Sequence, residues 1–294
     1  MDVAKLKGMG VAMVTPFDQN GNIDFGALKK LTQFLIDNDT DYLVVQGTTG
    51  ESPVLSEHEK MNILNTVIEV NNGKLPIVYG IGGNDTKAVA EKLTNFKITG
   101  VDAILSVSPY YNKPTQEGIF QHYKTISEAS HLPIILYNVP GRTASNVLAE
   151  TTLRIVNQCK NVIAVKEASG NFEQIMDIIQ NKPDNFLVIS GDDAITMPFI
   201  AAGGDGVISV VGNGFPKPFS DLVNLGLKGE TSKSRELHYK ILPIIKHLFS
   251  EGNPAGIKEV LHHLKIMENN VRLPLVKVSA ETKKMIISIT KSLY

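Results

Sequence analysis

A lysine stands where a buried strand is expected to end. In "VIAVKEASG", residues 162–170, four apolar residues lead directly into Lys166. On a strand, Ala164 and Lys166 share one face. If that face is turned toward an apolar interior, the neutral amine is favoured and can attack a ketone to form a Schiff base. Periodicity does not show which face points inward, and a lysine that reaches water or pairs with a carboxylate is the alternative.

Polar residues after other apolar stretches offer the groups that Schiff-base chemistry needs. Tyr137 follows "PIIL", and a phenol there is suited to relay protons, with Thr48 and Tyr111 extending the relay. The turn "GTTGE", residues 47–51, offers backbone N–H groups to a carboxylate, and Arg142 is suited to clamp a second carboxylate. The alternatives are a core tyrosine, a plain strand-to-helix connection and a surface arginine.

Eight apolar stretches are expected to position these residues. Their starts lie roughly 20 to 34 residues apart, and each stretch ends in small or polar residues. Strands that are apolar on both faces are typical of parallel sheets. Helical spacing of apolar residues follows Asp24, and Ser56 with Glu59 predicts a capping box before another helix. The eight predicted strands are residues 10–17, 42–48, 76–82, 103–109, 133–140, 162–169, 186–193 and 206–213.

Eight strand–helix units predict an α/β fold, a (β/α)₈ barrel whose active site lies at the carboxyl ends of the strands. An open doubly wound sheet is the alternative, but no G-x-G-x-x-G follows the first strand. Residues 1–228 are predicted to form the catalytic barrel domain. Residues 229–294 contain helical patterns without strands and predict a small C-terminal helical domain, in which Pro243 should kink or break the first helix.

Composition and charge narrow the class of protein. The 294 residues carry a net charge of −1 without a strongly basic stretch, which argues against nucleic acid, and the apolar runs are too short for a membrane span. One cysteine, Cys159, and an N-terminus without a secretory cleavage site predict a cytoplasmic protein. His262 and His263 lack metal-ligand spacing, so neither a metal nor a cofactor is expected. Asp192 and Asp193 are better suited to cap a helix than to act as an acid/base pair.

Four motifs carry a family resemblance. In order, "GTTGES", "SPYYNKPTQEG", "YNVPGRT" and "VIAVKEASG" resemble the dihydrodipicolinate synthase (4-hydroxy-tetrahydrodipicolinate synthase) family of pyruvate-dependent class I aldolases and lyases. The resemblance covers nearly the whole chain and weakens in the helical tail. It implies a lyase that condenses pyruvate with L-aspartate 4-semialdehyde through a lysine Schiff base, in diaminopimelate and lysine biosynthesis. It also implies a homotetramer arranged as a dimer of dimers.

Related enzymes leave the second substrate open. N-acetylneuraminate lyase and 2-keto-3-deoxy sugar-acid aldolases are similar in fold and in the first half-reaction, and a catalytically silent metabolite-binding barrel is the non-enzymatic alternative. The arginine of "NVPGRT", Arg142, favours the synthase. A short semialdehyde acid needs a carboxylate clamp, whereas a polyol needs hydroxyl partners.

The resemblance implies a role for each matching residue. Lys166 forms the imine with pyruvate, and Tyr137 is the acid/base. Thr48 and Tyr111 complete the proton relay, with Tyr111 supplied by the neighbouring subunit. The substrate-binding residues implied are Thr48 and Thr49 for the carboxylate of pyruvate, Arg142 for that of the semialdehyde, and Gly191 and Ile208 for the wall of the pyruvate pocket.

One set of positions departs from the family pattern. Lysine-inhibited members often carry histidines and a glutamate at the positions of Glu57, Lys60 and Ala88. Asn84 and Tyr110 match the effector pocket of the family. Since three polar partners are replaced, and Lys60 would repel the ammonium groups of lysine if it faces them, we expect no strong feedback inhibition by lysine.

Overall fold

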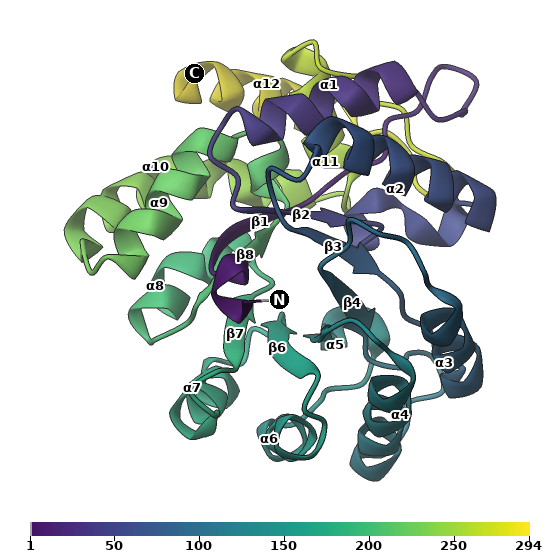
Figure 1. Cartoon of the computed structure of the whole chain (residues 1–294). Coiled ribbons are helices and arrows are strands. Elements are labelled where there is room, and N and C mark those ends of the chain that lie inside the picture. Colours follow the sequence, from purple (N-terminus) through teal and green to yellow (C-terminus); the bar gives the residue numbers. More distant parts are fainter. Residues whose placement is uncertain (1) are drawn as a thin grey trace.

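Eight parallel strands close into a barrel in this computed structural model, which describes residues 2–294. Each strand pairs with its neighbours in sequence, and the first also pairs with the last, with Gly10 beside Ile208 (Figure 1). The predicted barrel is confirmed, and closure by this pairing excludes the open sheet. The strands are β1 (Gly8–Ala12), β2 (Tyr42–Val45), β3 (Ile77–Gly80), β4 (Ala103–Val107), β5 (Ile134–Asn138), β6 (Val162–Glu167), β7 (Leu187–Ser190) and β8 (Gly206–Ser209).

Helices surround the barrel and begin where the sequence offers caps. The Asp24 carboxylate accepts from the Ala27 N–H at 2.9 Å, and the predicted capping box of Ser56 and Glu59 is present. Asp192 also caps, because its side chain accepts from the Ala194 N–H. The helices around the barrel are α1 (Phe25–Ile36), α2 (Glu57–Asn71), α3 (Thr86–Asn95), α4 (Gln116–Ala129), α5 (Pro140–Thr143), α6 (Ala149–Gln158), α7 (Phe172–Asn181), α8 (Thr196–Ala201) and α9 (Pro216–Leu227).

The two faces of the strands pack into two separate cores. On β6, Ala164 belongs to the core inside the barrel, and Val165 belongs to the core between the strands and the helices. Successive side chains on a strand alternate between faces, so Lys166 points into the barrel. This answers the question that periodicity left open. At the other end of the barrel, Leu6 of the 3₁₀-helix Val3–Leu6 is fully buried in the inner core.

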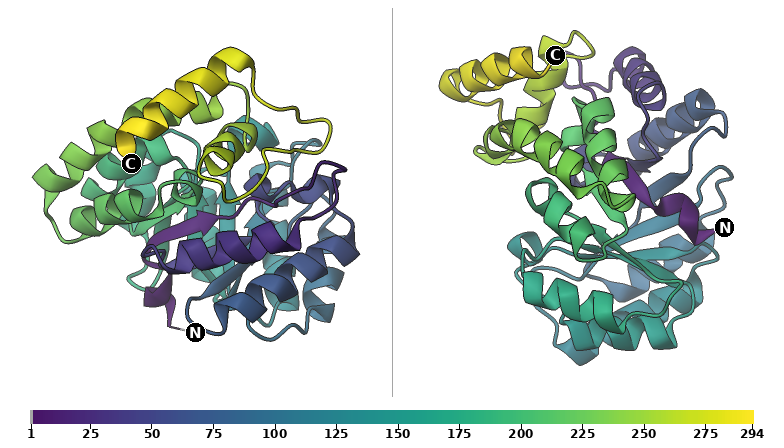
Figure 2. Two further views of the ribbon diagram at one scale, coloured as in Figure 1. Left: turned by 90° about the horizontal axis from the view of Figure 1, so that it is seen from above. Right: turned by 90° about the vertical axis from the view of Figure 1, so that its left-hand side faces the viewer.

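Three further helices, α10 (Thr231–Phe249), α11 (Ala255–His263) and α12 (Ala280–Leu293), form the C-terminal region. They lie together on one side of the barrel, and α10 packs against α9 and α12 (Figure 2). The helix α10 continues through Pro243, so the predicted break is wrong, and the kink that was the other predicted outcome stays a prediction. Buried Ile241 and Ile244 on either side of the proline anchor the helix, and this packing holds it where the ring removes a backbone hydrogen bond. The boundary at residue 229 stays a prediction.

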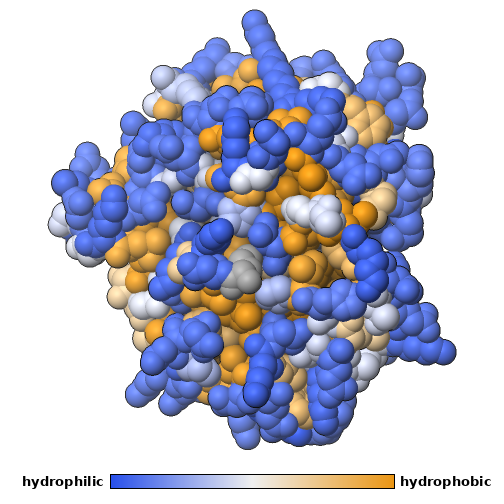
Figure 3. Space-filling model, viewed as in Figure 1, coloured by the Kyte–Doolittle hydropathy of each residue, from blue (hydrophilic) through white to orange (hydrophobic). Residues whose placement is uncertain are grey.

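The outer surface is mainly polar. On the face that Figure 3 shows, apolar side chains are visible near the centre and between the helices, within a surround of polar side chains. Within residues 2–294, no helix combines the length and the apolar character that a membrane crossing requires.

Candidate active site

Lys166 lies on the inner wall of the barrel with almost no solvent contact. The residue is 6% exposed, and its Nζ lies 4.3 Å from the centroid of the Tyr137 ring. The two residues are register partners on β5 and β6, which fixes their side chains side by side. The amine is thus held next to a phenol, the pairing that imine chemistry with proton transfer requires.

A glycine makes room for the lysine. A Cβ built on Gly191 would lie 2.7 Å from the Ala168 Cβ and 3.1 Å from the Lys166 Cε. The N–H of Gly191 donates to the Glu167 carbonyl at 2.7 Å, so the end of β7 approaches that of β6 closely. Any larger residue at position 191 would fill the space that the lysine side chain occupies.

Glu167, the next residue of β6, lies on the opposite face of the strand and is held by a network of hydrogen bonds. The Glu167 side chain is fully buried and accepts from Asn138 Nδ2 at 2.9 Å, from Gln174 Nε2 at 3.2 Å and from the Ser169 N–H at 2.7 Å. These bonds tie the carboxyl end of β6 to β5 and α7. Glu167 was not singled out from the sequence, because its partners are scattered amides without a motif.

The predicted carboxylate-binding turn forms a single 3₁₀ turn, Thr48–Gly50, directly after β2. Thr49 is 2% exposed, and its hydroxyl accepts from Asn253 Nδ2 at 2.9 Å. The Thr15 hydroxyl donates to the Gly50 carbonyl at 2.7 Å. The turn is therefore fixed both by the end of β1 and by the C-terminal region, and the second of these contacts has no sequence signal.

A cavity of about 830 Å³ lies at the carboxyl end of the barrel and gathers six of the eight predicted site residues. The C-terminal helix α10 covers it with Tyr239, Leu242, Pro243 and Lys246. An amphipathic helix was predictable here, but its place over the cavity was not. The six site residues on its wall are Thr48, Thr49, Tyr137, Arg142, Lys166 and Gly191.

Two predicted site residues do not reach this cavity. Ile208 is 1% exposed on the inner face of β8, where it belongs to the core inside the barrel. Tyr111 is 87% exposed with a left-handed backbone (φ 75°), so its ring projects from the surface of this chain.

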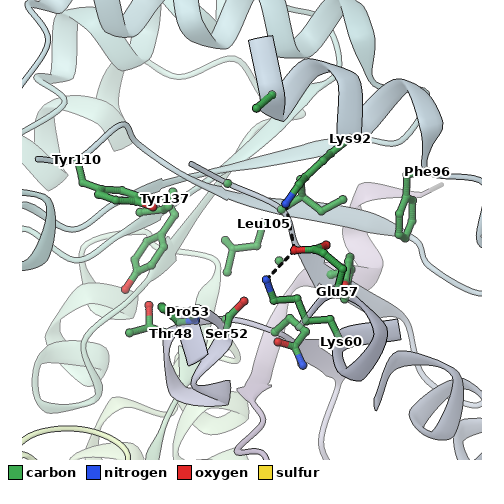
Figure 4. Close-up of a pocket in the computed structure, with 18 of the residues that line it drawn as sticks. Thr48, Ser52, Pro53, Glu57, Lys60, Lys92, Phe96, Leu105, Tyr110 and Tyr137 are labelled. Atoms are coloured by element: carbon green, nitrogen blue, oxygen red, sulfur yellow. Dashed lines mark hydrogen bonds and ion pairs between the residues drawn. The ribbon is translucent and has the colours of Figure 1, made fainter. Parts of the chain in front are cut away.

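A second cavity, of about 870 Å³, opens from the same end of the barrel and extends between α2 and α3. Thr48, Tyr137, Val139 and Arg142 line both cavities. Figure 4 shows this second cavity, with the Tyr137 hydroxyl directed toward Thr48 at one end of it. The two spaces are therefore neighbours that meet at the predicted proton-relay residues.

Charged residues line the far part of the second cavity. The Glu57 carboxylate pairs with Lys60 at 3.0 Å and with Lys92 at 3.1 Å (Figure 4). The hydrogen bond from Lys60 lowers the pKa of Glu57, and Lys92 acts in the same direction. The ammonium of Lys60 is thus partly neutralised where it faces the cavity. Ala88 and Tyr110 also line the cavity, whereas Asn84 donates to the Tyr110 carbonyl at 3.2 Å.

Comparisons with known proteins agree along the whole chain. The model of the Dihydrodipicolinate synthetase family matches residues 5–293. The 4-hydroxy-tetrahydrodipicolinate synthase of Parabacteroides distasonis is 54% identical over 98% of this chain and 97% of its own. The crystal structure of the dihydrodipicolinate synthase of Thermotoga maritima has a TM-score of 0.95 at 42% identity, covering 98% of each chain. That of Acinetobacter baumannii, complexed with pyruvate, has a TM-score of 0.95 at 36% identity, covering 98% of this chain and 99% of its own. This chain, with its lysine-bearing barrel, belongs to the Dihydrodipicolinate synthetase family.

Proposed function

We propose that this protein is a lyase that condenses pyruvate with L-aspartate 4-semialdehyde in diaminopimelate and lysine biosynthesis, with Lys166 as the Schiff-base residue. Membership of the family supports the reaction. The observation that carries the assignment is the position of Lys166, a residue only 6% exposed, on the cavity wall with its amine beside the Tyr137 ring. In the relative complexed with pyruvate, the same fold holds the first substrate.

The chemistry follows from the imine. The Lys166 amine attacks the keto carbon of pyruvate, and loss of water gives the imine. Its cation withdraws electrons, so a methyl proton leaves and an enamine forms. The enamine carbon attacks the aldehyde carbon of the semialdehyde, forming the new carbon–carbon bond. The amino group of the added substrate then displaces the lysine, which closes the ring and frees the enzyme.

Tyr137 is the acid/base of this sequence, and Thr48 and Tyr111 extend the relay. The position of Tyr137 on both cavity walls supports its role, since protons must leave the lysine cavity. Tyr111 projects 87% exposed from its own chain, which suits a residue that completes the site of a neighbouring subunit. A homotetramer built as a dimer of dimers would supply it.

Carboxylate recognition divides between two elements. The Thr48 and Thr49 turn holds the carboxylate of pyruvate next to the lysine, and Arg142 on α5 holds that of the semialdehyde. Gly191 shapes the pocket around the methyl and keto groups of pyruvate, whereas Ile208 lies in the core inside the barrel and not on the cavity wall. The guanidinium is solvent-exposed in the free enzyme, which is consistent with a group that meets the second substrate.

Reductive trapping tests this function. Incubation with pyruvate and borohydride, followed by peptide mass mapping, should place a reduced pyruvyl adduct on Lys166. Lys166→Ala should carry no adduct, and Lys246→Ala, which changes the other lysine that lines the cavity, should be trapped like the wild type. An adduct on a different residue, or none, would contradict the assignment.

A further inference from the structure

A buried ion pair joins the substrate turn to the C-terminal region. Glu51 directly follows the Thr48–Gly50 turn and has a left-handed backbone (φ 55°). Its Oε1 lies 2.5 Å from the Nζ of Lys258, a residue of α11 that is 207 positions away in the chain. Both side chains are completely buried. Neither residue lines the two cavities described above, so the pair does not contact substrate.

The remaining polar groups of the pair are also satisfied. The Glu51 Oε2 accepts from the Arg272 N–H at 3.0 Å, and Lys258 donates to the Asn270 carbonyl at 2.8 Å. The Lys258 ammonium lies 4.3 Å from the centroid of the Phe17 ring. Burial lowers the pKa of Lys258, and the Glu51 carboxylate acts in the opposite direction by favouring the ammonium. Each charge has fixed partners, so the geometry of the Glu51 carboxylate is fully determined.

A second contact from the same segment reaches the turn independently. Asn253 lies just before α11 and donates to the Thr49 hydroxyl at 2.9 Å. The turn is therefore bound on both sides, at Thr49 by Asn253 and at Glu51 by Lys258. A buried ion pair is often no more stabilising than apolar residues of the same size, so stability alone does not account for it. What the pair adds is a defined position for the Glu51 carboxylate and for the turn that Glu51 follows.

We propose that Lys258 and Glu51 are positioning residues, through which α11 fixes the Thr48–Gly50 turn in the orientation that binds the carboxylate of the keto acid. The inference rests on the proposed function for the identity of that ligand. It assigns part of substrate recognition to residues outside the barrel. Loss of the pair loosens the turn and weakens binding of pyruvate, while the amine and the acid/base residue stay in place.

The test uses a variant without an unpaired charge. Lys258→Met alone would strand the Glu51 carboxylate in the interior, so the double variant Glu51→Gln/Lys258→Met is the main protein to compare with wild type. The paired substitution Glu259→Gln/Lys283→Met is the matched control, because it removes the Lys283–Glu259 pair (3.0 Å) of the same helical region in the same way, without touching the turn. The pyruvate concentration that half-saturates borohydride trapping, kcat, and the melting temperature are measured for each protein.

We expect the double variant to need at least tenfold more pyruvate for half-saturation, with a smaller change in kcat at saturating pyruvate. Hydrogen exchange at the Gly50 and Glu51 amides, which donate to Gly47 and Thr48, should accelerate. The control should match the wild type in both readouts. A folded double variant with an unchanged pyruvate requirement and unchanged exchange would overturn the proposal, whatever its melting temperature.

Two further comparisons keep the outcome decisive. If the double variant does not fold, Glu51→Gln alone removes the charge of the carboxylate at nearly unchanged shape, and an unchanged pyruvate requirement with unchanged amide exchange in that variant would count against the proposal. Trapping of the wild type is measured in parallel. If the wild type forms no adduct at Lys166, the proposed function fails, and amide exchange at the turn still decides the positioning role.

Discussion

The Lys166 side chain occupies space that is free only because residue 191 is a glycine. In Gly191→Ala, the new methyl group would lie 2.7 Å from the Ala168 Cβ and 3.1 Å from the Lys166 Cε. We expect the rate of borohydride trapping with pyruvate to fall at least ~10-fold and stability to fall by about 1–3 kcal/mol. Gly141→Ala is the control, since nothing lies within 4 Å of its added Cβ. Equal trapping rates in the two variants would show that the lysine tolerates the crowding.

The role proposed for Arg142 distinguishes the two half-reactions. Removing the guanidinium in Arg142→Ala deletes a bidentate carboxylate contact, which corresponds to a loss of roughly 100-fold in condensation with the semialdehyde. Trapping with pyruvate alone should proceed as in wild type, because in the proposed function the carboxylate of pyruvate binds the Thr48–Thr49 turn. Condensation is followed in a coupled assay. A parallel loss in both steps would assign the arginine to the first substrate.

The sequence predicts which residues form the candidate site, but not how all of their side chains are oriented. The motifs and the strand ends identified six residues that line one cavity, because carboxyl ends of parallel strands meet at one end of a barrel. The orientation of Lys166 was not predictable, because Ala164 and Val165 make both faces of β6 apolar. The hydrogen bonds of Glu167 were not predictable either, because partners from separate segments of the chain leave no periodic pattern in the sequence.

At the scale of elements, α4 carries a histidine that is kept neutral by its surroundings. His122 is 2% exposed, and its Nδ1 lies 2.9 Å from the Thr86 hydroxyl. Burial lowers its pKa to about 4. In the unfolded chain the pKa of a histidine is near 6.5. Between about pH 4 and pH 6.5 the unfolded chain therefore binds a proton at this residue that the folded protein does not bind. The stability linked to this neutral ring is complete above about pH 6.5 and is lost as the pH falls toward 4.

We therefore expect His122→Gln to lose less stability than wild type between pH 7 and pH 4, by about 2–3 kcal/mol. Urea unfolding at several pH values measures the difference. His58→Gln changes an exposed histidine and should follow the wild-type profile. Parallel acid profiles for wild type and His122→Gln would show that the ring is charged in the fold.

Elements were predicted well where local signals are strong. All eight strands form within or overlapping their predicted ranges, and the predicted caps at Ser56 and Asp192 are present, because apolar runs and capping side chains act over a few residues. The helix break expected at Pro243 is absent, because the burial of Ile241 and Ile244 overrides the local preference. The placement of α10 over the cavity depends on tertiary packing that no local pattern encodes.

At the scale of the whole molecule, the exposed ring of Tyr111 leads to a test with mixed subunits. Lys166→Ala and Tyr111→Ala should each be nearly inactive alone. If each site takes Tyr111 from a neighbour, refolding the two variants together should restore sites that combine both intact residues. In a 1:1 random mixture, about a quarter of the wild-type activity is expected.

The readout is the activity of the mixture against the sum of the separate variants. A second mixture, of Lys166→Ala with Tyr137→Ala, is the control, because these two residues lie on one chain and adjacent strands. It should restore nothing. A mixture with Tyr111→Ala that also restores nothing, or a wild-type protein that sediments as a monomer, would contradict the shared site.

The overall barrel followed from counting strands, because eight parallel strands with crossover helices favour closure. The contacts of the C-terminal region with the turn after β2 could not be predicted from the sequence. Glu51, Lys258 and Arg272 are spread over more than two hundred positions, and in the sequence they resemble ordinary surface charges. The complete burial of Glu51 and Lys258, and the contact of Glu51 with the Arg272 N–H, appear only when the chain is folded.

The distance in sequence between Glu51 and Lys258 also has a consequence for biosynthesis. During translation, the eight strands leave the ribosome before the segment that holds the turn after β2. A nascent chain can thus have all eight strands of its barrel and still lack the segment that contacts the turn proposed to bind the keto acid. If the proposed role of Lys258 holds, a chain that ends before this residue binds the keto acid more weakly, so full activity is reached only near the end of synthesis.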